Sequence, residues 1–187
     1  STVREITRRL IVDDQVDVLF GPYSAVLTSS AAQVAEEHCK LLWNHGGASD
    51  NVYQQRNHWI IGILTPASQY LTGLLPLVRQ ADPTASTVGL VRASSGEFSK
   101  TVCTGVAETM ESLGFATVLI TEFAVATDDF SGVLHELKIA QPDVIVIVGR
   151  VRNDLRLARR LAESGINAGT VAVVAAGIQG FQDDLGS

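Results

Sequence analysis

Apolar residues recur along the chain with two alternating periods, one typical of helices and one typical of strands. Apolar side chains between Val3 and Ile11 lie three or four positions apart, which predicts a helix with one buried face. A β-rich run over residues 16–20 follows, and a Gly-Pro pair ends it. Pro76 is expected to kink or shorten the helix in which it lies. The same alternation predicts further helices over residues 25–38, 67–80, 100–113, 130–140 and from 153 or 154 to 165, and further strands over residues 40–43, 58–63, 87–91, 117–123, 144–148 and 171–175.

Two of the predicted strands are apolar at every position. Residues 144–148 read VIVIV and residues 171–175 read VAVVA, which is typical of parallel strands covered by helices on both faces. We therefore predict an α/β fold of doubly wound parallel sheets. Only three strands precede Pro66, and the first helix has no strand before it. We interpret residues 1–63 as a partial N-terminal lobe and residues 64–187 as a nearly complete C-terminal lobe of a longer protein, with the chain crossing between lobes near residues 60–66.

Charge and composition exclude several classes of partner. The formal net charge is -6, and no run of Lys or Arg provides the basic surface that nucleic acids or anionic membranes require. Hydrophobic residues make up 46% of the chain, yet no apolar run reaches the roughly 20 residues that cross a bilayer. The chain opens with the amphipathic stretch STVREITRRL, so we expect any export signal to have been removed.

The motifs of common enzymes and cofactor-binding proteins are missing from the sequence. No G-x-G-x-x-G, P-loop or G-x-S-x-G pattern is present, which argues against a nucleotide cofactor and against nucleophilic catalysis. The four histidines lack ligand spacing, so we predict no metal site. Cys39 and Cys103 are interpreted as two buried thiols. We therefore predict neither a cofactor nor a catalytic residue, and a small α/β enzyme is the most distant alternative.

Two loops that follow strands carry groups suited to a small ligand. The loop GPYSAVLTSS opens a helix with Ser24 and Ala25, and the free amides of a helix N-terminus attract carboxylates. An ordinary serine N-cap is the alternative interpretation. The loop NHGGASDN also follows a strand, and its two glycines are expected to expose backbone carbonyls and amides to a ligand, next to the hydroxyl of Ser49. In the C-terminal lobe, Phe98 and Arg150 follow two other strands and are expected to form an opposing wall.

Three runs of the sequence resemble a known family. They are LIVDDQVDVLFGPYSAVLTSSAAQVAEEHCKLLW, ATDDFSGVLHELKIAQPDVIVIVG and LARRLAESGI, and in this order they are similar to the branched-chain amino acid and amide receptors of ABC importers. These receptors are type I periplasmic binding proteins. The resemblance implies two doubly wound lobes that close on a ligand like a hinge, of which this chain is similar to the middle part.

The resemblance also implies roles for particular residues. The family's carboxylate loop falls on Ser24 and Ala25, and its second ligand loop falls on Gly46, Gly47, Ala48 and Ser49. The tyrosine that often covers the ligand falls near Phe98, and a second aromatic position falls on Arg150. The acid that often grips the ligand ammonium should lie near Val174, where this chain has none. The resemblance without this acid argues against a plain α-amino acid held by its ammonium group, and it favours an amide, a carboxylic acid, an aromatic acid or another anionic ligand.

The resemblance implies a protein that works outside the cytoplasm. We predict a periplasmic or cell-surface lipoprotein that delivers an amino acid, an amide or a small carboxylic acid to the permease of an ABC importer, with no covalent cofactor. The alternative is the ligand-sensing domain of a membrane receptor or regulator, since the same fold serves signalling and transport.

Overall fold

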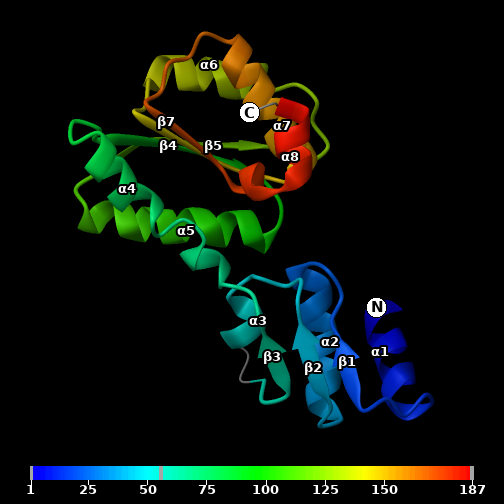
Figure 1. The fold of residues 1–187 in the computed structure, drawn as a ribbon. Helices are drawn as coiled ribbons and strands as arrows, with labels where there is room; N and C mark the ends of the chain where they lie inside the picture. The colour runs from blue at the N-terminus through cyan, green and yellow to red at the C-terminus, as the bar shows by residue number, and fades with distance from the viewer. Residues whose placement is uncertain (1, 55–56, 186–187) are drawn as a thin grey trace. The chain divides into compact units, whose positions relative to one another are not determined.

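The computed structural model describes residues 2–54 and 57–185. The chain divides into two compact units, one that ends at Tyr70 and one that begins at Leu71. The sequence analysis placed the division after residue 63, and the lobe boundaries of the whole protein stay a prediction. Each unit holds its own parallel sheet, as Figure 1 shows, and each is described by itself below.

The first unit is a three-stranded parallel sheet with the order β1-β2-β3. Between consecutive strands the chain returns through helical and loop segments to the same end of the sheet, as parallel pairing requires. Its elements are α1 (Thr2–Val12), β1 (Val18–Phe20), α2 (Ala25–Glu37), β2 (Leu41–Asn44), α3 (Asn51–Gln54), β3 (Ile60–Gly62) and the 3₁₀ helix η1 (Ala67–Gln69).

The core of the first unit lies between the sheet and helices α1 and α2. Leu19 and Leu42 point into it from neighbouring strands, and small α2 residues such as Ala31 let the helix approach the sheet closely. The opposite face of the sheet is exposed and carries Phe20 and Trp43, whose ring centroids lie 6.4 Å apart. In the described residues of this unit, α1 and α2 thus cover one face of the sheet.

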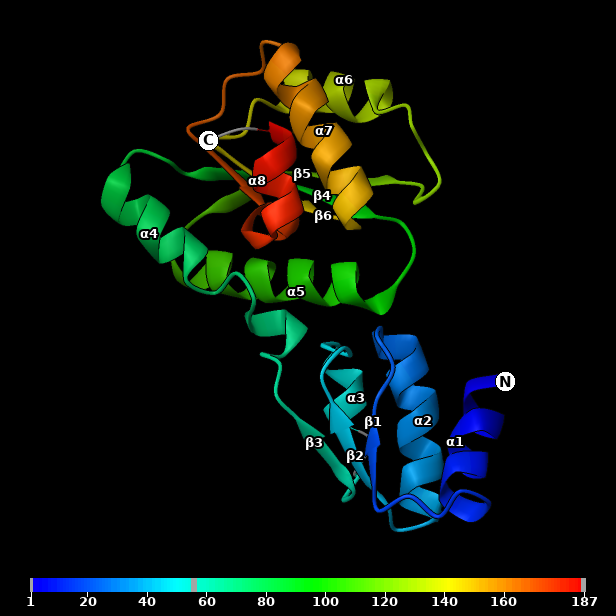
Figure 2. The same ribbon diagram turned by 45° about the vertical axis from the view of Figure 1, so that its right-hand side comes forward.

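The second unit is a four-stranded parallel sheet with the order β5-β4-β6-β7. Figure 2 shows α4 and α5 on one face of the sheet and α6 and α7 on the other, which is the doubly wound arrangement predicted. Its elements are α4 (Leu74–Ala81), β4 (Thr87–Ala93), α5 (Glu97–Ser112), β5 (Ala116–Phe123), α6 (Ser131–Ala140), β6 (Val144–Val148), α7 (Val151–Glu163), β7 (Thr170–Val173), η2 (Val174–Gly177) and α8 (Gln179–Leu185).

Strand β6 forms the centre of the second core. All its residues are buried, as the unbroken apolar run predicted. On the α6–α7 face, Leu137 and Leu157 pack against Ile145 and are fully buried. Phe123 and Phe130 meet edge to face with their centroids 5.4 Å apart, which closes this core at the carboxyl end of β5.

Three local expectations differ from the structure. Helix α7 begins at Val151, two residues before the expected start, and Arg150 caps it without a side-chain hydrogen bond. The helix expected over residues 67–80 is divided into η1 and α4, and Pro76 lies in the first turn of α4, where its missing amide hydrogen costs nothing. Cys39 is exposed rather than buried, whereas Cys103 is buried as expected.

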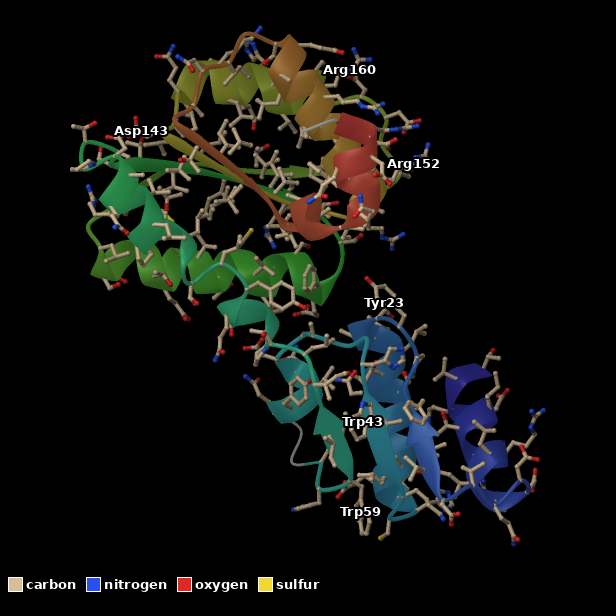
Figure 3. The ribbon with its side chains drawn as sticks, in the orientation of Figure 1. Tyr23, Trp43, Trp59, Asp143, Arg152 and Arg160 are labelled. Carbon is tan, nitrogen blue, oxygen red and sulfur yellow. The ribbon has the colours of Figure 1, made fainter. Side chains whose placement is uncertain are left out.

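The amino end of the second sheet is fastened by Asp143. Its Oδ2 accepts hydrogen bonds from the amide of Ser86 at 2.8 Å and from the amide and hydroxyl of Thr87 at 2.9 and 2.8 Å. These donors hold the pKa of Asp143 below its usual range, the Ser86 amide most of all. Figure 3 shows Asp143 at one edge of the second unit. The contact joins the starts of β4 and β6 at the amino end of the second sheet.

Candidate ligand-binding site

The loops that follow β1 and β2 are joined by backbone hydrogen bonds. The two strands are parallel neighbours with Phe20 opposite Trp43, so their carboxyl ends lie at the same edge. The amide of Gly21 donates to the carbonyl of Trp43 at 2.8 Å, and the amide of Ser24 donates to the carbonyl of Gly46 at 3.0 Å. Figure 3 shows Tyr23 at this end of the first unit and Trp59 at the other end. The two loops proposed from sequence therefore lie together.

Ser24 caps helix α2 in an unusual backbone conformation. Its φ is 101°, in the region that favours glycine, and its Oγ accepts the amide of Leu27 at 3.4 Å. The carbonyl of Ser24 accepts the amide of Thr28 at 3.0 Å. No described residue provides a hydrogen-bond acceptor for the amides of Ala25 and Val26. Two donors thus stay open at the positive end of a 13-residue helix.

The two glycines allow the second loop to touch the first. A Cβ at Gly46 would lie 2.7 Å from the Cα of Tyr23, and a Cβ at Gly47 would lie 2.7 Å from the Cβ of Thr28. Neither distance is compatible with a side chain unless the backbone moves. The glycines are therefore required for close approach between loops, since neither has a positive φ.

Asn44, at the end of β2, organises the second loop and was missed by the sequence analysis. Its buried side chain accepts the amides of Gly46 and Gly47 at 3.2 and 2.8 Å through Oδ1. Its Nδ2 donates to the carbonyl of Gly47 and to the hydroxyl of Tyr53, each at 2.8 Å. Burial raises the pKa of the Tyr53 hydroxyl, so it stays a neutral partner. An asparagine directly after an apolar strand and before two glycines was the available signal.

These contacts engage backbone groups that the sequence analysis had assigned to a ligand. The sequence analysis expected the glycines to present backbone groups to a ligand, but the amides of Gly46 and Gly47 are both used by Asn44. The carbonyl of Ala48 is likewise used, since it accepts the amide of Ala67 at 2.7 Å. The two glycine amides already have partners within the protein, so a group without such a partner is the better candidate for a ligand, and contact of the glycines with a ligand stays a prediction.

Ser49 supplies such a group. The residue is 1% exposed, and its Oγ has no hydrogen-bond partner among the described residues. The neighbouring Asp50 is engaged, because its carboxylate accepts the amide and hydroxyl of Ser68 at 3.1 and 2.6 Å. A buried hydroxyl without a partner is costly in a folded protein. The first unit thus combines two open amides and one unpaired hydroxyl in adjoining loops.

In the second unit, the predicted residues lie where the strand order reverses. Phe98 is half-buried in the first turn of α5, which follows β4, and Arg150 is exposed at the start of α7, which follows β6. Strands β4 and β6 are neighbours, and the chain winds outward from them in both directions. Crevices at such switch points are the usual binding places of open α/β sheets. Phe98 and Arg150 therefore share one edge of the sheet.

Neither a metal centre nor a membrane span emerges from the described parts of the chain. There, no group of three or more His, Cys, Asp or Glu residues is placed to hold a metal ion. In the same residues, no helix has the length and apolar character needed to cross a membrane.

Each of the two α/β units has a parallel sheet with polar loops at the carboxyl ends of its strands. A class of small-molecule receptors is built in this way. The family model described as periplasmic binding protein matches residues 1–186. The chain belongs to this family, and within it to the type I proteins of the branched-chain amino acid and extracellular ligand-binding receptor group, as the sequence resemblance predicted. The family binds small solutes outside the cytoplasm and works with ABC transporters.

Solved structures share the fold at low sequence identity. A leucine-binding protein from Thermotoga maritima matches with a TM-score of 0.83 at 16% identity, over 99% of this chain and 52% of that one. A branched-chain amino acid binding protein from Streptococcus pneumoniae, in complex with isoleucine, matches with a TM-score of 0.79 at 16% identity, over 97% and 51%. A solute-binding protein from Rhodopseudomonas palustris HaA2, in complex with p-hydroxybenzoic acid, matches with a TM-score of 0.80 at 18% identity, over 92% and 46%. The chain thus spans about half the length of these proteins, and the likeness concerns the fold alone.

Proposed function

We propose that the protein binds a small carboxylate-bearing molecule, an amino acid, an amide derivative or a carboxylic acid, and delivers it to an ABC importer. The observation that carries the proposal is the unpaired, buried hydroxyl of Ser49 in a loop hydrogen-bonded to the loop that opens α2. The open amides of Ala25 and Val26 supply two further donors. A carboxylate would gain three hydrogen bonds from these groups.

Neutral donors suffice for a carboxylate at this place. The loops at residues 21–24 and 45–50 contain no Lys or Arg. The N-terminus of a helix carries a partial positive charge, and its amides already point toward an incoming anion. Hydrogen bonds to a charged acceptor contribute about 1.5–3 kcal/mol each when well formed, so three of them would account for selection of the ionised form.

The range of ligand bodies follows from relatives of the same fold. The solved structures were obtained with isoleucine in one case and with p-hydroxybenzoic acid in another, and both ligands carry a carboxylate. The rest of each ligand differs, one being aliphatic and the other aromatic. We propose that the carboxylate is the shared determinant in this chain as well.

We propose that Phe98 and Arg150 determine selectivity for the part of the ligand that differs from one carboxylate to another. A guanidinium at residue 150 stacks on aromatic rings and pairs with carboxylates in a bidentate manner. Phe98 is an aromatic residue in the first turn of α5, after the neighbouring strand β4. The pair favours an aromatic acid or a second carboxylate over a plain aliphatic amino acid. The segment Val174–Gly177 has no acidic residue to hold an ammonium group, which supports the same choice.

The test begins with a thermal-shift screen of the protein against amino acids, amides and aromatic acids. A ligand present at 100 times its Kd should add about 2.7 kcal/mol of stability. The best ligand is then measured by calorimetry against Ala25→Trp, in which an indole would cover the open amides. Ala162→Trp, at an exposed position of α7, is the matched control. Loss of binding in Ala25→Trp alone supports the site, and equal affinity in both variants would show that the carboxylate binds elsewhere. Uptake of the labelled ligand by cells with and without the protein tests delivery.

A further inference from the structure

A buried carboxyl group in the second unit links two loops at the carboxyl edge of the sheet. Asp154 is 0% exposed and lies near the start of α7, after β6. Its Oδ2 accepts the amide of Ala175 at 3.3 Å, in the 3₁₀ segment Val174–Gly177 that follows β7. Its Oδ1 has no hydrogen-bond partner among the described residues. One side chain thus reaches from the helix after β6 to the segment after β7.

The carboxyl group of Asp154 is closely packed at Gly149. A Cβ at Gly149 would lie 2.5 Å from Oδ1 of Asp154 and 2.8 Å from Cζ of Phe123, so the carboxyl is pressed against the backbone of Gly149. The adjacent Asn153 is fixed as well, because its Nδ2 donates to the carbonyl of Val125 at 3.1 Å. Ionised or neutral, the carboxyl has to find its partners within this confined space.

The surroundings of Asp154 carry no compensating charge. Its neighbours Gly149 and Ala175 are neutral, and so is Phe123 beside the same glycine. On its own helix, the exposed Arg152 and the half-buried Arg156 are paired with Asp128. The remaining charged groups of these elements are exposed: Arg150 before α7, Arg159, Arg160 and Glu163 on α7, Glu122 on β5, and Asp183 and Asp184 on α8. None of them perturbs the carboxyl: burial raises the pKa of Asp154 to about 7, against the lowering effect of the Ala175 and Gly149 amides.

We propose that Asp154 is a proton-dependent positioning residue: its ionised carboxylate holds the segment Val174–Gly177 against the start of α7, and uptake of a proton shifts that segment. The reason is the change in hydrogen bonding. A carboxylate accepts the Ala175 amide strongly, whereas the neutral acid is a weaker acceptor and gains an O–H donor that needs an acceptor of its own. The loop edge of the second unit therefore has two arrangements within the neutral pH range.

The proposal gives a physical role to a departure from the family pattern. The resemblance places a ligand-gripping acid near Val174, and this chain lacks one there. Asp154 brings a carboxyl group to the same segment from a neighbouring helix, but this group accepts a hydrogen bond from the backbone amide of Ala175. The acid thus acts on the position of the segment. This inference rests on the second unit alone and does not depend on the carboxylate site proposed in the first.

Nuclear magnetic resonance of the 187-residue chain between pH 5 and 9 tests the proposal without a ligand. The carboxyl carbon of Asp154 and the amide of Ala175 are expected to titrate together, with a midpoint near pH 7. In Asp154→Asn the Ala175 amide should no longer titrate. Asp129→Asn is the control, because this exposed aspartate caps α6 through the Ser131 amide and should leave the Ala175 titration unchanged.

Two outcomes would overturn the proposal. The first is a carboxyl carbon of Asp154 in the wild type that is constant from pH 5 to 9. The second is an Ala175 amide that titrates equally in Asp154→Asn, which would assign the effect to another group. The wild-type carbon signal needs no variant, so the test holds even if Asp154→Asn folds poorly. Failure here leaves the Ala25 and Ser49 site untouched, and loss of that site leaves this titration untouched.

Discussion

The amide of Ser24 donates a hydrogen bond of 3.0 Å to the carbonyl oxygen of Gly46, and this contact unites two loops that are far apart in sequence. Ser24 reaches the geometry through a φ of 101°, which a serine adopts only at an energetic cost. Such strain persists where the surrounding structure determines the backbone, and it is common at binding sites. The open amides of Ala25 and Val26 lie directly after the strained residue. The loop junction therefore sets the direction of the helix N-terminus.

Gly47 is predicted not to tolerate a side chain. In Gly47→Ala the new Cβ would lie 2.7 Å from the Cβ of Thr28, so the loop has to move. We expect a loss of about 1–3 kcal/mol in the free energy of unfolding, together with a weaker affinity for the ligand. Gly132→Ala is the matched control, since nothing lies within 4 Å of a Cβ at that helical position. It should be neutral or stabilising by about 0.5–1 kcal/mol, and chemical denaturation measures both. Equal stabilities of the two variants would contradict the close approach.

Asn44 is predicted to matter for affinity as well as for stability. Asn44→Ala leaves the buried amide of Gly47 and the part-buried amide of Gly46 without their acceptor, at a cost of about 1–3 kcal/mol for each unsatisfied group that water cannot reach. Asn44→Asp keeps the acceptor but loses the donation to Gly47 and Tyr53. We expect the alanine variant to bind ligand more weakly than the aspartate variant, measured by calorimetry on samples shown to be folded by circular dichroism. The reverse order would mean that the donor side of Asn44 fixes the loop.

Asp143 is predicted to make the protein less stable in acid. Its pKa is lowered in the folded state, so its contribution is present above the unfolded-state value of about 3.9 and is lost as the pH falls through the folded-state value. Asp143→Ala should lower the free energy of unfolding by about 2 kcal/mol at pH 7. The difference from the wild type should shrink as the pH falls below the ordinary aspartate range. Urea unfolding at several pH values measures it, and a gap independent of pH would refute the role of the ionised form.

Asp154 is predicted to change stability with pH in the opposite direction, making the protein less stable as the pH rises. Its folded-state pKa is raised to about 7, so its stabilising contribution is complete below the unfolded-state value of about 3.9 and is lost as the pH rises through 7. At about 1.4 kcal/mol per pKa unit, the loss between pH 4 and 8 is at most about 4 kcal/mol. Asp154→Asn should remove this part of the pH dependence and be more stable than the wild type at pH 8. A variant with an unchanged slope would show that the carboxyl is hydrated in the native state.

The sequence predicted the elements whose pattern was unambiguous. Strand β6 was predicted with its observed bounds, because five consecutive apolar residues between two turn signals indicate a buried strand and give its two ends. The start of α7 was predicted at Asn153 or Asp154, because both are good capping residues. In the structure these side chains turn inward, toward Val125 and Ala175, and the helix starts earlier. Tertiary contacts outweighed the local preference.

The same limit applies to the candidate site. Ser24 and Ser49 were proposed because serines in loops after parallel strands are a local signal, and the structure adds that the loops touch. Asn44 was missed because its importance lies in partners that only the folded loop brings within reach. The glycines were recognised for exposing the backbone, whereas they are needed for contact with Tyr23 and Thr28. Spacing in a sequence shows which loops matter, but not which atoms remain free.

Ser49 gives the most direct test of the proposed function, because stability and affinity should respond with opposite signs. Ser49→Ala removes a buried hydroxyl that has no partner among the described residues, so the free energy of unfolding should stay the same or rise, by about 1 kcal/mol or less. If the hydroxyl donates to the ligand carboxylate, the same variant should lose about 1–2 kcal/mol of binding energy, roughly a tenfold rise in Kd. Ser68→Ala is the control, since its hydroxyl is already bonded to Asp50 and should affect stability rather than affinity. Denaturation and calorimetry on both variants separate the cases. A destabilised Ser49→Ala protein with unchanged affinity would assign the hydroxyl to the fold and remove it from the site.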